Sequence, residues 1–325
     1  MARLSSIDLR HFVFRGPGRT WPAQALCVLP FAAVLTLGAC ARPGTSRPVE
    51  DTETSGRISI VTSTDLHPLV AQEAAAFRTA YPQATLELAE PSPSGQVVSP
   101  LLGGSADVVV IARDLEQEER DMARAGGIEV EGHRIALDAL AVVVATANPV
   151  ENVTVGELQR IWSGEFTDWS SLGGARQRII PVLPPLSADR ARAFAQRVMG
   201  GAPMRAASMM EPTDSAVAAR VARTPGAIGV VPLALAGALG VRALRVAALE
   251  GLPYVEPDME SVHEGRYPLT HPVNLYVRVH RPRLAGGFVT YVASQPGQEL
   301  VLASGRVPTS VPLRFVRRSP MLGSH

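Results

Sequence analysis

The sequence predicts an α/β protein built from two doubly wound lobes, and the alternation of two hydrophobic periods carries this prediction. Ile58–Val61 is a short β-branched run, and the apolar residues of Leu69–Phe77 then recur at helical spacing. A second strand over 84–90 and helical spacing over 97–102 repeat the unit, and Ala106–Ile111 is a continuous apolar run. Such a run is typical of a strand buried on both faces, and the alternation is typical of a doubly wound sheet.

The same alternation continues through the second half of the chain. Thr154–Glu157 has the capping-box pattern that opens a helix. The remaining predicted elements are strands at 139–145, 179–183, 227–231 and 273–277 and helices at 187–199, 214–221 and 288–301.

Length and composition set limits on the class of protein. The 325 residues leave room for two lobes with substantial cores, and 46% hydrophobic with 19% charged residues is typical of a globular chain. A net charge of +1 gives no general attraction to nucleic acid. All 31 basic residues are arginine, so a cation at any site must be a guanidinium or an imidazolium.

The N-terminal segment has the features of an export signal. Basic residues precede the apolar run 23–37, which is too short for a durable membrane span. The run leads through small residues into Cys40, which resembles a bacterial lipoprotein signal whose cysteine is lipidated. The alternative is an ordinary signal peptide that contains this cysteine by chance. Cys27 is the only other cysteine, so the mature chain would form no internal disulfide.

These features predict the terminal segments. Residues 1–39 are expected to form the signal peptide, and 40–56, which are rich in Pro, Thr, Ser and Glu, a flexible tether. The mature protein would be held on the outer face of the cytoplasmic membrane, or in the periplasm, through a lipid at Cys40. Residues 314–325 show little pattern and are predicted to be disordered.

A polar turn, Thr62–Asp65, lies between the first predicted strand and helix, and it allows two readings. A hydroxyl or carboxylate of this turn caps the helix. Alternatively, the free N–H groups and partial positive charge of the helix N-terminus hold an anion there.

The most specific motif of the chain is Ile161–Gly174, with an aromatic residue, Ser-Gly, Asp-Trp and a closing Gly-Gly; the others are Asp138–Val144, Thr224–Gly229, Tyr267–Pro272 and Pro296–Gln298. Together these motifs resemble the phosphate-type periplasmic solute-binding proteins of ABC transporters, over about residues 57–312. The resemblance implies two α/β lobes joined by a hinge that the chain crosses twice. Residues 57–143 with 268–313 would form one lobe, and 144–267 the other.

The resemblance also implies an anion-binding site made of four short segments, each altered here. In the turn 62–65 a threonine replaces a glycine, and an aspartate stands where a hydroxyl residue is usual. The turn 93–95 keeps its serine, 111–113 has lost two serines but ends in arginine, and 184–190 has a proline for its first arginine. The implied ligand-binding residues are Ser63, Thr64, Asp65, Ser94, Gly95, Arg113, Ser187 and Arg190.

These changes bear on the ligand, because a desolvated oxyanion needs a donor for nearly every oxygen. Asp65 would repel a dianion unless it is protonated or turned away, although a protonated phosphate could donate to it. The implied function is binding of phosphate or another small oxyanion by hinge closure, with ABC permease subunits as partners. The alternative is a surface-anchored sensor or assembly protein with a degenerate site.

An enzymatic function is not expected. The sequence has no Gly-x-Ser-x-Gly, HExxH, Walker A or CxxC pattern, and the implied mechanism requires no metal or organic cofactor. His67 and His271 stand where the family tends to have Tyr and Arg, so each is either a surface histidine or part of the cleft lining.

Overall fold

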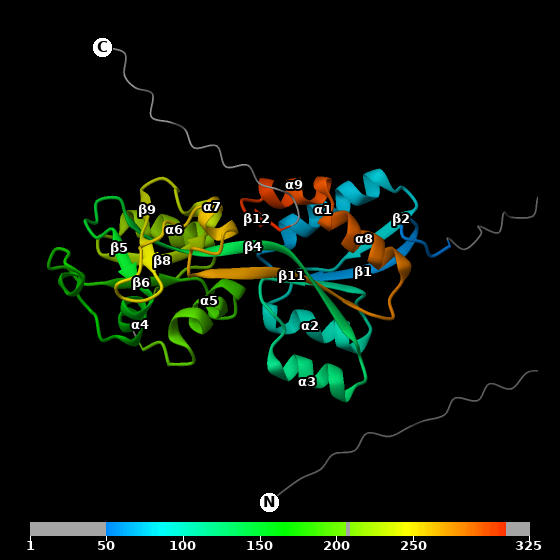
Figure 1. Cartoon of the computed structure of the whole chain (residues 1–325), viewed down its shortest axis with the longest axis horizontal. Helices are drawn as coiled ribbons and strands as arrows, with labels where there is room; N and C mark the ends of the chain where they lie inside the picture. The colour runs from blue at the N-terminus through cyan, green and yellow to red at the C-terminus, as the bar shows by residue number, and fades with distance from the viewer. Residues whose placement is uncertain (1–49, 206–208, 310–325) are drawn as a thin grey trace, which may run out of the picture. The chain divides into compact units, whose positions relative to one another are not determined.

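The computed structural model describes residues 50–205 and 209–309 (Figure 1). The predicted signal segment 1–39, Cys40 and the predicted tail 314–325 lie outside these residues. None of the described helices is long and apolar enough to cross a membrane.

The first lobe begins with the predicted strand and helix alternation. β1 (Gly56–Thr62) pairs in parallel with β2 (Ala84–Leu88) on one side and β3 (Val108–Ile111) on the other. The connections are α1 (His67–Ala80) and α2 (Ser94–Gly103). Since the parallel strands end at one edge of the sheet, the polar turns that follow β1 and β3 lie at the same edge.

One long strand carries the sheet from the first lobe into the second. β4 (Val130–Ala145) pairs antiparallel with β11 (Thr270–Arg278) as far as Ala139, and from Leu140 onward with β8 (Ala227–Pro232). β11 also pairs with β3, so ten strands form a single sheet. Only 139–145 was predicted as strand, because the first half of β4 contains several polar and charged residues.

The second lobe surrounds the far end of this sheet. β8 pairs in parallel with β6 (Ile180–Leu183), which pairs with β7 (Met209–Met210). The capping box is confirmed, since the Glu157 backbone N–H donates to Thr154 Oγ1 over 3.1 Å at the start of α4 (Val155–Ser163). The other elements are α5 (Asp189–Phe194), a π-helical turn (Ala195–Met199), α6 (Asp214–Arg223), α7 (Met259–His263), β5 (Asn152–Thr154), β9 (Val241–Ala243), β10 (Arg245–Ala247) and short 3₁₀ turns at Trp169–Leu172 and Leu233–Leu235.

Helices cover both faces of the sheet, which makes each lobe a three-layer structure. In the first lobe α1, α8 (Arg283–Ala293) and α9 (Gln295–Ala303) lie on one face, and α2 and α3 (Gln117–Ala125) on the other (Figure 1). Phe77 and Phe288 pack edge to face in the first of these layers, with ring centroids 5.6 Å apart. Trp162 and Trp169 of the specific motif are fully buried in the second lobe, so they are packing residues.

The predicted helix 288–301 is wrong as a single element. Ser294 has extended backbone angles, φ −76° and ψ 169°, and it separates α8 from α9. Pro296 lies in the first turn of α9, where its missing N–H costs no hydrogen bond. The last strand of the described residues is β12 (Val307–Pro308), which pairs antiparallel with β4.

Part of the segment predicted as a tether is attached to the first lobe. The Asp51 carboxylate accepts hydrogen bonds from the backbone N–H groups of Arg283 and Leu284, over 2.9 and 3.3 Å. Ser55 is buried and donates to the Glu50 carbonyl. Residues 50–55 therefore close over the N-terminus of α8, and residues 40–49 of the predicted tether lie outside the described part.

Candidate functional site

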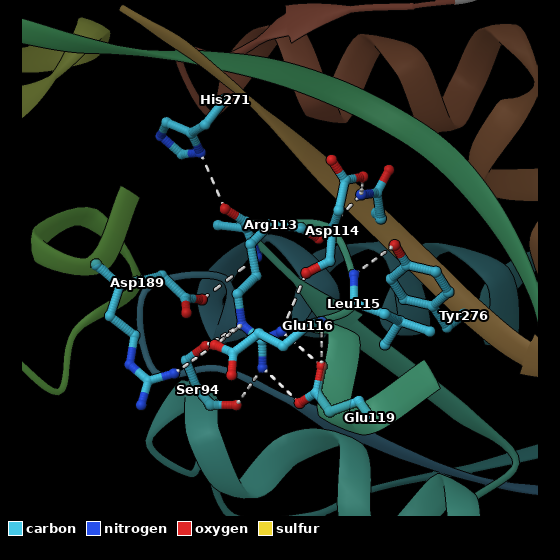
Figure 2. Close-up of polar contacts among 12 residues, drawn as sticks. Ser94, Arg113, Asp114, Leu115, Glu116, Glu119, Asp189, His271 and Tyr276 are labelled. Atoms are coloured by element: carbon cyan, nitrogen blue, oxygen red, sulfur yellow. Dashed lines mark hydrogen bonds and ion pairs between the residues drawn. The ribbon is translucent and has the colours of Figure 1, made fainter. Parts of the chain in front are cut away.

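The candidate site lies where the two lobes meet beside the crossing strands β4 and β11. The turn after β1, the end of β3 and the first residues of α2 contribute from the first lobe, and α5 and α6 from the second. Figure 2 shows Asp189 of α5 pointing toward the end of β3, where Arg113 extends toward Ser94 and Glu119.

The turn after β1 places a hydroxyl and a carboxylate together. Ser63 is buried and its hydroxyl donates to Asp65 Oδ1 over 2.8 Å, whereas Thr64 is exposed. The Thr62 hydroxyl donates to the Val110 carbonyl over 3.2 Å, so it ties β1 to β3. Within this turn, Ser63 and Asp65 are thus the side chains that face the site's other charged groups.

Arg113 is buried and all five of its N–H donors are used by the protein. Nε and Nη2 donate to the Ser94 hydroxyl and carbonyl, and Nη1 donates to the Asp114 carbonyl. Nη1 and Nη2 also bind the Glu119 carboxylate in a bidentate pair over 2.7 and 2.8 Å. Burial raises the pKa of Glu119, but Arg113 outweighs burial and the net pKa is lowered. In this arrangement Arg113 orients Ser94 rather than presenting free donors.

Arg190 is almost wholly buried and is held by two aspartates. Nε and Nη2 bind the two oxygens of Asp214 over 3.0 Å each, and Nη1 lies 3.6 Å from Asp138 Oδ2. Burial opposes the charge, but Asp214 and Asp138 outweigh it and raise the pKa of Arg190. Nη1 is buried and has no hydrogen-bond partner among the described residues, so both of its N–H groups are unused.

The two crossing strands place a carboxylate and an imidazole side by side. Asp138 on β4 is the registered partner of His271 on β11. Burial acts to raise the pKa of Asp138, but the positive charges of Arg190 and Arg306 act against it and the net pKa is lowered. Burial lowers the pKa of His271, which favours the neutral ring at neutral pH. Since His271 Nδ1 lies 3.1 Å from the Ala112 carbonyl, Nδ1 must be the protonated nitrogen and Nε2 is left as an acceptor.

Asp189 reaches from the second lobe to the first. Its Oδ2 accepts the Ala112 backbone N–H over 3.3 Å, and its Oδ1 is buried without a hydrogen-bond partner in the described part of the chain. Burial and the neighbouring Asp65 raise the pKa of Asp189 to about 6.

The predicted residues differ in how closely they approach the site. Ser63, Asp65, Ser94, Arg113 and Arg190 come together, and their role in binding stays a prediction. Ser187 and Thr64 are exposed, and α5 begins two residues after Ser187. Gly95 is exposed and lies against a guanidinium of the second lobe, because a Cβ there would be 3.2 Å from Arg192 Nη2.

Sequence reasoning missed most of the acidic residues of the site. The site contains four aspartates and three arginines: Asp65, Asp138, Asp189 and Asp214 with Arg113, Arg190 and Arg306. Asp189 directly precedes the predicted ligand-binding residue Arg190, so its proximity to the site could have been noticed in the sequence. The contacts of Asp138 and Asp214 with Arg190 join segments that are far apart in the chain. No group of three or more His, Cys, Asp or Glu in residues 50–205 and 209–309 has the arrangement of a metal site.

A groove of about 1200 Å³ opens beside the site, between α3 and α5. Its lining includes Ala112, Arg113, Glu116, Arg192, His271 and Tyr276. Of the predicted ligand-binding residues only Arg113 lines it, so the hydroxyl and carboxylate cluster lies outside the groove lining.

Two α/β lobes joined by crossing strands, with charged groups gathered at the strand ends, are the architecture of the periplasmic binding proteins. Residues 48–296 match the family model described as PBP superfamily domain, and the chain belongs to this family. It has the type 2 periplasmic binding protein fold that the resemblance implied.

Three known proteins illustrate the similarity. The phosphate-binding protein PstS of Bacillus subtilis is 27% identical over 295 residues, which cover 88% of this chain and 93% of that protein. PstS of Pseudomonas aeruginosa is 23% identical, with 78% and 83% covered. The crystal structure of an ABC-type phosphate transport receptor from Vibrio cholerae superposes with a TM-score of 0.68 at 22% identity, covering 78% of this chain and 100% of that one.

Proposed function

We propose that this protein is the solute-binding subunit of an ABC uptake system and that it takes phosphate or a related small oxyanion between its lobes. The observation that carries the proposal is the meeting of the β1 turn, the α2 start, the end of β3 and α5 at one place. The 27% identity to a phosphate-binding protein across 93% of that protein supports the same ligand class.

The proposed mechanism is hinge closure about the crossing strands. β4 changes partner from β11 to β8 between Ala139 and Leu140, so small changes in backbone angle there would move one lobe against the other. The donors offered to an oxyanion would be the Ser63 hydroxyl, once it turns from Asp65, the N–H groups of Arg190 Nη1 and backbone N–H groups of the strand ends. The closed form would then dock on the permease.

The cellular arrangement is part of the proposal. The chain would be exported by residues 1–39, anchored by a lipid on Cys40, and would face the outer surface of the cytoplasmic membrane or the periplasm. Mass spectrometry of the membrane-extracted protein tests this directly, because a diacylglyceryl adduct on Cys40 is expected and an unmodified thiol would contradict the anchor.

Calorimetry on the purified full chain tests the ligand. Phosphate, sulfate, tungstate and small carboxylates are titrated in turn, and binding of phosphate at micromolar concentration is expected. Ser63→Ala should weaken phosphate binding by about tenfold, the value of one hydrogen bond to a charged group. Ser170→Ala is the matched control, since Ser170 is exposed and bonds only within its own turn to Asp168. No heat with phosphate at micromolar concentration would overturn the ligand assignment.

The second candidate is a surface-anchored sensor or assembly protein whose solute site is degenerate. It is favoured by the use of all Arg113 donors on Ser94, Asp114 and Glu119 and by the aspartate pair on Arg190. X-ray scattering separates the candidates: compaction on adding phosphate supports uptake by hinge closure, and an unchanged radius of gyration with no binding heat supports the second candidate.

A further inference from the structure

The Asp189 carboxylate lies against donors of the opposite lobe as a bound anion would. Asp189 is only 2% exposed, and its Oδ2 accepts the Ala112 N–H of the first lobe over 3.3 Å. Ala112 belongs to the third of the four segments that the resemblance assigned to the anion site. A solute oxyanion and the Asp189 carboxylate therefore need the same backbone donor.

The surroundings of Asp189 offer it little compensating charge. Asp65 faces it from the turn after β1 and repels its charge, while the Ser63 hydroxyl adjoins both carboxylates. Arg113 attracts it from the end of β3, but the Arg113 donors are all bound to other groups, among them the buried Glu119. Burial and Asp65 therefore dominate, in agreement with a pKa of about 6 for Asp189.

The nearby guanidinium groups of the site are already paired with carboxylates other than Asp189. Arg190, the next residue of α5, is neutralised by Asp214 on α6 and Asp138 on β4. His271 on β11 is buried with a lowered pKa and is neutral at neutral pH. Deprotonated Asp189 thus adds a carboxylate charge with no ion-pair partner of its own, at the place where an oxyanion would bring further negative charge.

A second contact holds α5 on the first lobe. Arg192 Nη1 binds Glu116 Oε1 over 2.8 Å, and the Arg192 guanidinium packs on Gly95 at the start of α2. The short segment Asp189–Arg192 therefore joins the lobes at two points, and the side chain of Asp189 is fixed toward Ala112 rather than free to turn into solvent.

We propose that Asp189 is a tethered competitor of the solute: its carboxylate holds the Ala112 N–H and repels an oxyanion, so the site accepts an oxyanion when Asp189 is protonated or displaced. This inference rests on the proposed function, because it concerns the same site. It makes Asp189 a determinant of affinity and of pH response.

The expected pH response follows from the protonation of Asp189. Only protein with a neutral Asp189 binds the oxyanion, so the apparent affinity equals the intrinsic affinity multiplied by the neutral fraction. With a pKa of about 6, the loss is about thirtyfold near pH 7.5 and about nil near pH 5. Phosphate itself ionises in this range, so the measured quantity is the ratio of variant to wild-type affinity at each pH, which cancels the titration of the ligand.

Asp189→Asn in the full chain is the direct test, because it removes the charge and keeps an acceptor for Ala112. Calorimetry with phosphate should show the variant binding about thirtyfold tighter than wild type near pH 7.5 and equally near pH 5. Asp121→Asn is the matched control; Asp121 is exposed and pairs only with Gln117 and Arg124 on its own helix. Equal or weaker binding by Asp189→Asn near pH 7.5 overturns the inference.

Hydrogen exchange tests the contact itself with no anion added. The Ala112 amide should exchange faster in Asp189→Ala than in wild type, while Asp189→Asn leaves it protected. Unchanged exchange in Asp189→Ala overturns the inference whatever the calorimetry shows. If wild type binds phosphate and the variants bind no tighter, the inference fails and the proposed function stands. If no protein binds phosphate, the proposed function fails together with the competition.

Discussion

Glu73 gives the sharpest prediction for stability. It lies on the inner side of α1, is 2% exposed, and neither carboxylate oxygen has a hydrogen-bond partner in the described part of the chain. Its neighbours along the buried face of α1 are Val70, Ala74 and Phe77. Burial raises the pKa of Glu73 from 4.5 to about 8, so the folded state holds a proton that the unfolded chain releases.

The sign and size of the effect follow from this difference. Below about pH 4.5 both states are protonated and Glu73 carries no electrostatic cost, whereas between about pH 4.5 and 8 the unfolded state gains stability from ionisation. At about 1.4 kcal/mol per pKa unit, the free energy of unfolding falls by about 3 kcal/mol between pH 5 and pH 8 through this group alone.

Glu73→Gln removes the titration and keeps the shape of the side chain. Urea denaturation of the variant and of wild type is measured at about pH 5 and about pH 8. The difference in free energy of unfolding, variant minus wild type, should be about 3 kcal/mol larger at pH 8 than at pH 5. Comparing the two pH values cancels the cost of burying the new amide. Glu299→Gln is the control, since that carboxylate is exposed on α9. Parallel pH profiles for Glu73→Gln and wild type would refute the reasoning.

Three further changes test the packing of the first and second lobes. Glu119→Gln should lower the free energy of unfolding by about 3–5 kcal/mol at neutral pH, because Arg113 is left buried without its charge partner. The pKa of Glu119 is lowered in the folded state, so this loss should shrink as the pH falls through the folded-state pKa of Glu119. Thr154→Ala removes a helix cap and should cost about 1 kcal/mol in urea denaturation. Gly287→Ala would place a Cβ directly against the Glu53 carbonyl, so proteolysis near residue 53 should be much faster than in wild type.

The strands and helices with strong apolar periodicity could be predicted from the sequence. β3 and β8 are nearly continuous apolar runs that the structure buries on both faces, and β1 is buried from Ile60 to Thr62. α3 was missed because its only buried side chains are Glu119 and Ala123, so it has no apolar stripe to detect. The helix is stabilised instead by a capping box at Glu116 and by the ion pair between Glu119 and Arg113, and hydrophobic periodicity does not detect such contacts.

The site was predictable only in part, for a related reason. Ser63, Ser94 and Arg113 follow strands or precede helices, and topology alone brings such positions to one edge of a sheet. What each arginine does there depends on partners far along the chain: Arg190 meets Asp138 and Asp214 through the folding of β4 and α6. Spacing carries no information about such pairings, so the sequence could not show that Arg190 is held by two carboxylates, and its role in ligand binding stays a prediction.

Different residues determine the fold and the affinity for the ligand, because a single charge near the site changes affinity strongly. The lobes are held together by cores in which the buried side chains of the strands are mostly apolar. The ligand is decided by few side chains, and a unit charge about 4 Å from another is worth about 4 kcal/mol at a partly screened site. One extra carboxylate such as Asp189 can therefore change oxyanion affinity by orders of magnitude without altering the core. Affinity for phosphate in this chain should accordingly depend more on the protonation of Asp189 than on any residue of the scaffold.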